Sequence, residues 1–210
     1  MSYKISVIGM GYVGCGNGLL FSKDHNVLMV DIDQKKVNAF NNKQLPISDK
    51  FAQKYFENKD LNIQATSDLI NSIQNANFIL LCLPTNFDEK TGQYDTDSIE
   101  KIISTIISNN QEAVIIIKST VNIGYTESLQ KKFDTKKIIF SPEFLREGHA
   151  LEDNLNPSRI IIGGLDSNAR LFGEMLSKSI HIDEAPLIFM TSTAAESVKL
   201  FSNTYLAMRV

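Results

Sequence analysis

Two carboxylates, Glu143 and Glu147, stand four residues apart directly after the apolar run 138–140. If the segment is helical, this spacing puts both side chains on one face. Like charges that close raise the pKa of one carboxyl group, which suits a group that must handle a proton. The alternative, favoured by composition alone, is a solvated loop with two ordinary acids.

A second pair with the same spacing lies near the C-terminus, where Lys199 and Asn203 fall within a helical pattern. An ammonium and an amide presented side by side offer two donors to an oxygen that develops negative charge in a reaction. The alternative is a solvated helix face.

A glycine-rich loop, formed by Gly9, Gly11 and Gly14, lies between the apolar run 5–8 and the helical pattern 12–23. Such spacing is typical of a dinucleotide site: the first glycine permits the tight turn, the second admits the pyrophosphate, and the third lets the helix pack on the sheet. The helix N-terminus then faces the phosphates. Tyr12 and Val13 open that helix, and we include them in the predicted site. The alternative is that the glycines only shape a turn.

Asp31 closes the next apolar run, about 20 residues after the first glycine, where a carboxylate holds the ribose 2′-hydroxyl. It favours NAD over NADP, because a 2′-phosphate would meet like charge. Lys35 and Lys36 weaken that preference, and Lys36 is itself a candidate cofactor contact.

Two other expected strands end in polar residues, Pro84 and Thr85 after one and Thr120 after the other. Ligands of doubly wound sheets collect at the carboxyl ends of strands. We therefore expect Pro84 and Thr85 to contact the cofactor, and the hydroxyl of Thr120 to orient a water or substrate oxygen. The alternative is that both hydroxyls cap the segments that follow. Cys15 and Cys82 fit small buried residues better than nucleophiles.

Strand and helix patterns alternate along the chain, which predicts an α/β, Rossmann-like, doubly wound and mostly parallel sheet with helices on both faces. The expected strands are residues 5–8, 27–30, 78–83, 114–117, 138–140, 159–163 and 187–190. The expected helices are residues 12–23, 35–41, 49–58, 96–108, 124–133 and 167–179.

The C-terminal segment follows a different pattern. Thr193 and Glu196 have the spacing of a capping box, and the helix that they begin reaches Val210 without a stop signal. We interpret residues 1–190 as the dinucleotide-binding domain and residues 191–210 as the start of a long central helix. A terminal helix that ends bluntly is the alternative.

Composition excludes several classes of function. The 210 residues carry a formal net charge of −3 with no basic tract, so no nucleic-acid surface is expected. No apolar run approaches the ~20 residues that span a bilayer. Two cysteines make no disulfide framework, and a cytoplasmic, reducing compartment is the default.

In combination, five stretches resemble the UDP-glucose/GDP-mannose dehydrogenase family: residues 9–14, 118–121, 141–148, 156–160 and 195–207. The resemblance implies NAD as cofactor and UDP-glucose as substrate, which is oxidised to UDP-glucuronate by two hydride transfers with a covalent cysteine adduct between them. It also implies a homodimer formed through the central helix, and a second, sugar-binding domain that supplies the cysteine and lies outside this chain. No metal is implied.

The resemblance also implies roles for single residues. Lys199 and Asn203 would stabilise oxyanions, Glu143 would assist thioester hydrolysis, Thr120 would position water, and Glu147 would lie between substrate and nicotinamide. The sugar nucleotide would contact residues of both pairs and the loop between them: Glu143, Phe144, Leu145, Arg146, Glu147, Lys199 and Asn203.

Two alternatives stay open. One is a relative that acts on UDP-N-acetylmannosamine or GDP-mannose, although residues 145–148 favour the glucose enzyme. The other is a stand-alone NAD-binding module, which would not need Lys199 and Asn203.

Overall fold

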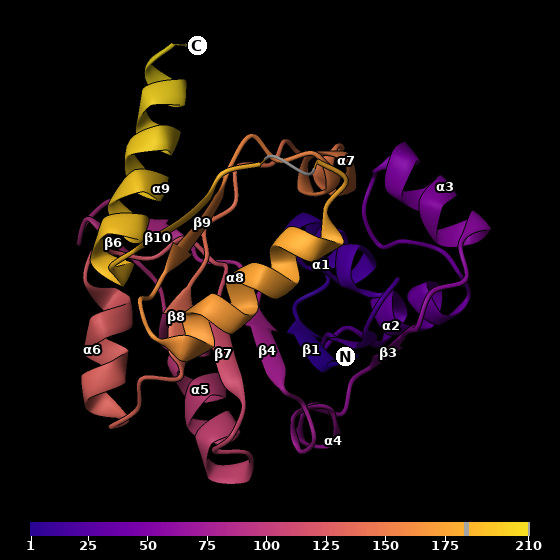
Figure 1. Cartoon of the computed structure of the whole chain (residues 1–210), viewed down its shortest axis with the longest axis horizontal. Coiled ribbons are helices and arrows are strands. Elements are labelled where there is room, and N and C mark those ends of the chain that lie inside the picture. The colour runs from indigo at the N-terminus through magenta and orange to yellow at the C-terminus, as the bar shows by residue number, and fades with distance from the viewer. Residues whose placement is uncertain (183–184, 210) are drawn as a thin grey trace.

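An eight-stranded sheet forms the centre of the computed structural model, which describes residues 1–182 and 185–209 (Figure 1). In spatial order its strands are β10 (Leu187–Met190), β9 (Ile160–Gly163), β8 (Ile138–Phe140), β7 (Val114–Ile117), β4 (Phe78–Leu81), β1 (Lys4–Ile8), β2 (Asn26–Val30) and β3 (Ile63–Thr66). The helices are α1 (Tyr12–Phe21), α2 (Gln34–Asn41), α3 (Lys50–Asn58), α4 (Leu69–Ile73), α5 (Asp97–Asn109), α6 (Tyr125–Lys132), α7 (Ala150–Leu155), α8 (Ser167–Ser179) and α9 (Ser192–Met208).

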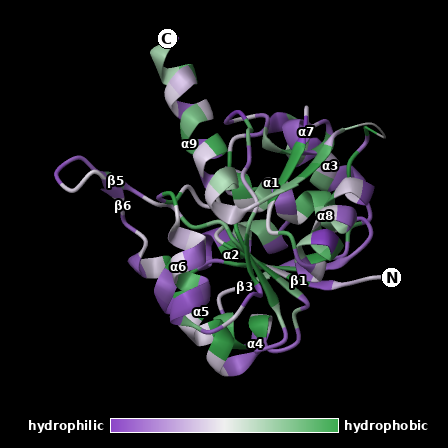
Figure 2. Cartoon of the chain, turned by 60° about the vertical axis from the view of Figure 1, so that its left-hand side comes forward, coloured by the Kyte–Doolittle hydropathy of each residue, from purple (hydrophilic) through white to green (hydrophobic). Residues whose placement is uncertain are grey.

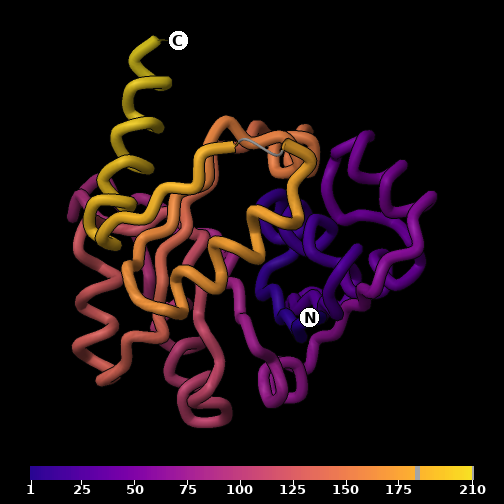
Figure 3. The backbone as a smooth tube through the Cα atoms, viewed as in Figure 1, coloured from indigo at the N-terminus to yellow at the C-terminus, as the bar shows by residue number. Residues whose placement is uncertain are grey.

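Six neighbouring strands of the sheet are mutually parallel: β3, β2, β1, β4, β7 and β8. The order of the strands reverses between β1 and β4. The chain winds outward through β2 and β3 on one side of β1, then crosses back to β4, β7 and β8 on the other, as Figure 3 shows. This arrangement confirms the predicted doubly wound, mostly parallel sheet. The reversal between β1 and β4 is where such folds bind ligands.

The last two strands run against the others. β9 pairs antiparallel with β8, and β10 pairs parallel with β9. The sequence predicted both strands but not their reversed direction, because a buried apolar run has the same composition in either direction.

Successive side chains along each strand point to opposite faces of the sheet, and each face packs against a layer of helices. In β4, Phe78 and Leu80 join the core beneath α1, α3 and α8, whereas Ile79 and Leu81 join the core beneath α4, α5 and α6. Burial on both faces explains why the strands are continuous apolar runs. The hydropathy colouring of Figure 2 places these runs at the centre of the molecule.

Several short elements were not predicted. β3 has one buried residue, Ala65, and its pattern of mixed polarity acquires strand geometry by pairing with β2. The hairpin of β5 (Phe87–Asp88) and β6 (Gln93–Tyr94), which projects from the body in Figure 2, was also missed. So were α4 and α7, which have five and six residues.

The C-terminal helix is present, but the predicted capping box is wrong. Thr191 is the N-cap of α9 and its hydroxyl accepts a hydrogen bond from the backbone N–H of Ala194. Glu196 instead reaches α6, where its carboxylate accepts from the backbone N–H of Gly124 at 2.6 Å and from the N–H and hydroxyl of Thr126 at 2.8 and 2.6 Å. The residue that resembled a local cap therefore joins two helices.

Candidate functional site

The glycine loop joins β1 to α1 in a shape that requires glycine at two positions. Gly9 has a φ of +102°, and a Cβ there would lie 2.4 Å from the carbonyl oxygen of Cys82. A Cβ on Gly14 would lie 1.8 Å from the carbonyl oxygen of Gly9. A Cβ on Gly11, in contrast, would meet nothing within 4 Å. The loop is thus packed tightly against the protein at Gly9 and Gly14 and has open space at Gly11.

The open space at Gly11 fits the pyrophosphate of a dinucleotide. Gly11 is the N-cap of α1, and no side chain among the described residues caps this helix end. The first N–H groups of a helix lack partners within the helix and carry the positive end of its dipole. Those of Tyr12 and Val13 are therefore available to a phosphate oxygen, as the sequence predicts.

Asp31 stands at the carboxyl end of β2 beside this loop. Its Oδ2 accepts hydrogen bonds from the backbone N–H of Met10 at 2.9 Å and from Lys36 Nζ at 3.2 Å, and its Oδ1 accepts from the N–H of Asp33 at 3.0 Å. Partial burial acts to raise the pKa of Asp31, but these donors outweigh it and hold the pKa below its usual range. The carboxylate is therefore a fixed, charged acceptor where the ribose of a dinucleotide would lie.

A cavity of about 240 Å³ lies at the carboxyl ends of β4 and β7, next to the start of α1. Thr85 Oγ1 donates a hydrogen bond to the backbone carbonyl of Thr120 at 2.7 Å, which ties the two strand ends together. Neither threonine is a helix N-cap, because α5 starts after Thr96 and α6 after Gly124. The cavity is lined by Val13, Cys82, Leu83, Pro84, Thr85, Lys118, Ser119, Thr120, Glu143, Leu145 and Lys199.

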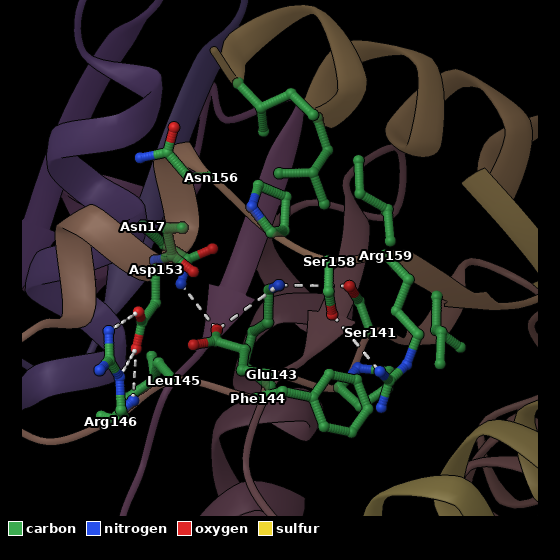
Figure 4. Close-up of a pocket in the computed structure, with 18 residues that line it drawn as sticks. Asn17, Ser141, Glu143, Phe144, Leu145, Arg146, Asp153, Asn156, Ser158 and Arg159 are labelled. Atoms are coloured by element: carbon green, nitrogen blue, oxygen red, sulfur yellow. Dashed lines mark hydrogen bonds and ion pairs between the residues drawn. The ribbon is translucent and has the colours of Figure 1, made fainter. Parts of the chain in front are cut away.

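Glu143 is buried at the centre of a polar cluster (Figure 4). Asn17 donates from Nδ2 to Glu143 Oε1 at 2.7 Å, and Lys118 Nζ lies 3.5 Å from the same oxygen. Lys118 Nζ also donates to Ser141 Oγ at 3.2 Å. On the opposite side, Lys199 Nζ donates to the backbone carbonyl of Glu143. Helix α1 and the end of β7 thus meet the carboxyl group of Glu143, and helix α9 meets its backbone carbonyl.

The protonation equilibria of this cluster are shifted. Burial raises the pKa of Glu143, and the charge of Lys118, the amide of Asn17 and the charge of Lys199 partly offset that rise. Burial lowers the pKa of Lys199, opposed by the charge of Glu143. A carboxyl group that protonates more readily beside an ammonium that deprotonates more readily is typical of sites that transfer protons.

The expectation that Glu143 and Glu147 share a helical face is wrong. Residues 141–149 form no helix in the structure, and Glu143 is buried whereas Glu147 is exposed. The raised pKa of Glu143 follows from burial and not from a second carboxylate.

The other sequence-predicted side chains divide between the cluster and the surface. The Phe144 ring lies 4.3 Å from the Arg159 guanidinium and 5.6 Å from Lys199 Nζ. Arg146 is exposed and forms a two-point ion pair with Asp153, with Nη2–Oδ1 at 2.7 Å and Nε–Oδ2 at 3.2 Å. Asn203 is exposed, one turn beyond Lys199 on α9. The structure thus joins Lys199 to Glu143 and leaves Asn203 outside the cluster.

Sequence reasoning missed Asn17, Lys118 and Ser141. Lys118 was the available signal, because a lysine that directly follows four apolar strand residues must place its charge at a buried strand end. Asn17 was a second signal, because it is the one amide among the small and apolar residues of α1 and asparagine is rarely buried. It is 1 % exposed.

Cys15 and Cys82 are free and buried, as expected of small core residues. Burial raises the pKa of Cys15 to about 12 and that of Cys82 well above its ordinary value. The described residues contain no group of three His, Cys, Asp or Glu side chains placed to hold a metal ion. No helix in residues 1–182 or 185–209 is long and apolar enough to cross a membrane.

The strand order, the glycine loop and Asp31 together define a dinucleotide-binding domain of the Rossmann type. The family model of the NAD-binding domain of the UDP-glucose/GDP-mannose dehydrogenase family matches residues 3–205. This chain therefore belongs to that family, and its cofactor is NAD.

Similar proteins agree with this assignment. The chain is 46% identical to UDP-glucose 6-dehydrogenase of Campylobacter jejuni over 99% of its length and 53% of that protein. It is 41% identical to the Streptococcus pneumoniae enzyme of the same name, of which it covers 54%. A UDP-glucose dehydrogenase structure from Pyrobaculum islandicum matches the whole chain with a TM-score of 0.87 and 25% identity, over 51% of its own length. The chain thus spans about half the length of these relatives.

Proposed function

We propose that this chain is the NAD-binding half of an enzyme that oxidises UDP-glucose to UDP-glucuronate. The relatives at 46% and 41% identity are both named UDP-glucose 6-dehydrogenase, which supports this substrate over other nucleotide sugars. The observation that carries the proposal is the buried Glu143 at the wall of the cavity beside the glycine loop, with Lys118 beside its carboxyl group and Lys199 bound to its backbone carbonyl.

We assign parts in the reaction to the main residues of the predicted site. NAD supplies the hydride acceptor, held by the first turn of α1 and by Asp31. Lys199 donates to the oxygen of the substrate as negative charge develops on it, and Asn203 adds a second donor once substrate and the remainder of the protein order that surface. Thr120 orients the attacking water, Glu143 takes its proton during hydrolysis of a cysteine thioester, and Glu147 lies between sugar and nicotinamide.

The proposed enzyme is a homodimer assembled through α9. The support is the apolar surface on the second half of α9, where the exposed fractions of Phe201, Leu206 and Met208 are 73%, 62% and 80%. Phe201 and Met208, two turns apart, share one face of α9, and exposed apolar surface of this kind marks association sites. The helix extends away from the body of the molecule in Figure 1, which leaves it accessible to a partner.

The test is an assay of the full-length gene product with NAD⁺ and, separately, UDP-glucose, UDP-N-acetylmannosamine and GDP-mannose. We expect NADH formation to be fastest with UDP-glucose and to reach two NADH per sugar nucleotide. Faster turnover of either other sugar would reassign the substrate. An absence of turnover with all three would refute the proposed activity while leaving the family intact.

A further inference from the structure

Two polar atoms next to the Glu143 cluster are buried and lack a hydrogen-bond partner among the described residues. They are Glu143 Oε2 and Asn154 Nδ2. The other carboxylate oxygen of Glu143 is fully engaged by Asn17 and Lys118. A buried polar atom without a partner costs about 1–3 kcal/mol, so native proteins supply one, from the protein or from ordered water.

Both residues line a second cavity, of about 300 Å³, between α1, α7, the end of α8 and residues 141–146 (Figure 4). It shares Lys118, Glu143 and Leu145 with the first cavity, and its remaining lining is distinct. Glu143 is therefore part of the wall between the two cavities. One cavity adjoins the glycine loop, and the other opens between α7 and α8.

The second cavity has the properties of a water site. A cavity needs at least about 10–15 Å³ to hold a water, and the water needs two to four polar partners. This cavity offers Glu143, Asn154, Ser141 and Ser158, with room for several molecules. The Asn154 amide is held in place by the close approach of α7 to α1, since a Cβ on Gly16 would lie 2.8 Å from Asn154 Nδ2.

We propose that this second cavity holds ordered water bound to Glu143 Oε2 and Asn154 Nδ2, and that this water exchanges the proton of Glu143 with solvent. The proton route rests on the proposed function, in which Glu143 is the base of thioester hydrolysis. In that step the water oxygen bonds to the acyl carbon, the C–S bond breaks with sulfur leaving as thiolate, and the proton of the water passes to Glu143. Cofactor and substrate close the first cavity at that moment, so the proton leaves through the second.

Crystallography of the 210-residue chain tests the water site without any activity. We expect ordered water within about 3.2 Å of Glu143 Oε2 and of Asn154 Nδ2 in the wild-type chain. Asn154→Leu should displace it. Asn109→Leu is the matched control, because Asn109 is exposed on α5, away from the cavity, and its amide already donates to the Thr105 carbonyl at 2.8 Å. A dry cavity in the wild-type chain would overturn the proposal.

Asn154→Asp covers the case in which the leucine variant does not fold. It keeps the volume and replaces the donor by a carboxylate that shares the water with Glu143. The titration of Glu143, followed by ¹³C NMR of its carboxyl carbon, should then move to higher pH. An unmoved titration would show that the two side chains lie too far apart to share a water, which would overturn the proposal.

Kinetics of the full-length protein test the proton route. Because general-base catalysis contributes about 10²–10⁴ in rate, we expect Asn154→Leu to slow thioester hydrolysis by about 10-fold or more. NAD⁺ binding and the first hydride transfer should stay at the wild-type rate, and Asn109→Leu should match the wild type in every step. Unchanged hydrolysis in Asn154→Leu would refute the route. A wild-type enzyme inactive on UDP-glucose would instead refute the proposed function, and the crystallographic result would still decide the water site.

Discussion

Asp31 shows how one carboxylate is prepared for a ligand before the ligand arrives. Backbone N–H groups of Met10 and Asp33 fix its orientation, and Lys36 balances its charge. A ribose 2′-hydroxyl can donate to this carboxylate, whereas a 2′-phosphate would bring negative charge against it. The nearby Lys36 reduces that repulsion but is already paired with Asp31.

We therefore predict that the chain binds NAD⁺ more tightly than NADP⁺, and that Asp31→Ala weakens NAD⁺ binding by about 1–2 kcal/mol, the scale of a charge-assisted hydrogen bond. Isothermal titration of both cofactors against wild type and variant measures this. Asp60→Ala, at an exposed position, is the control. Equal or tighter binding of NADP⁺ by the wild-type chain would contradict the prediction.

Lys199, unlike Asp31, is proposed to act on charge that develops during the reaction. In the full-length enzyme, Lys199→Ala should reduce kcat by about 10²–10³, the usual loss on removing one oxyanion donor, while NAD⁺ affinity changes little. Asn203→Ala should show a smaller loss, because a neutral amide stabilises an oxyanion less than an ammonium does. Steady-state kinetics with Lys101→Ala as control decide this. Near-normal kcat with a raised KM would mean instead that Lys199 binds the substrate and the transition state equally well.

Glu143→Gln should affect a later step than Lys199→Ala, because the carboxylate is proposed to act on the thioester. An amide cannot accept the proton of the attacking water. The variant should therefore form the covalent adduct and accumulate it, and mass spectrometry of the enzyme quenched with substrate present should detect the added mass. A variant that turns over without accumulation would assign hydrolysis to another base.

At the scale of elements, the position of Lys199 depends on how α9 docks. Glu196, one turn earlier on α9, is fully buried and accepts three hydrogen bonds at the start of α6. Thr193 adds a fourth contact, donating to Glu127 at 2.8 Å. The lysine thus reaches Glu143 because the base of its helix is anchored to a neighbouring helix.

Glu196→Ala should lower the free energy of unfolding of the chain by about 1–3 kcal/mol or more, because it leaves buried donors of Gly124 and Thr126 unpaired. Urea denaturation followed by circular dichroism measures the change. Glu100→Ala removes a part-exposed ion pair with Lys132 and should cost less than about 1 kcal/mol. Similar losses in both variants would show that the Glu196 contacts do not hold the helix.

The elements that the sequence predicted are those whose signal is local. Strands such as 114–117 are uninterrupted apolar runs, and the glycine loop carries its own spacing. The direction of β9, the edge strand β3 and the role of Glu196 depend on partners far along the chain. The same holds for the site, since Asn17 meets Glu143 across 126 positions. No local pattern encodes a contact of that separation.

At the scale of the whole molecule, one buried histidine links folding to pH. His25 accepts a hydrogen bond at Nδ1 from the backbone N–H of Tyr3, and burial lowers its pKa below 6.5. Between the lowered and the ordinary pKa the unfolded chain binds the extra proton and the folded chain does not, so stability falls as pH drops below 6.5.

We predict that the free energy of unfolding decreases more steeply with falling pH in the wild-type chain than in His25→Gln, whose side chain cannot titrate. Denaturation curves collected from pH 7.5 down to pH 5 measure the two slopes. Parallel dependences would assign the acid sensitivity to other groups.

The chain alone should bind NAD⁺ and yet produce no NADH from UDP-glucose. Covalent chemistry at a sulfur requires an accessible thiolate. Cys15 and Cys82 are both buried, and the pKa of Cys15 rises to about 12, so almost none of it is ionised at neutral pH. The chain also spans only 53–54% of its two relatives named UDP-glucose 6-dehydrogenase.

An absorbance assay at 340 nm with excess UDP-glucose, run beside the full-length protein as positive control, tests whether the chain alone produces NADH. Sustained NADH formation by residues 1–210 would mean that this half carries a complete active site.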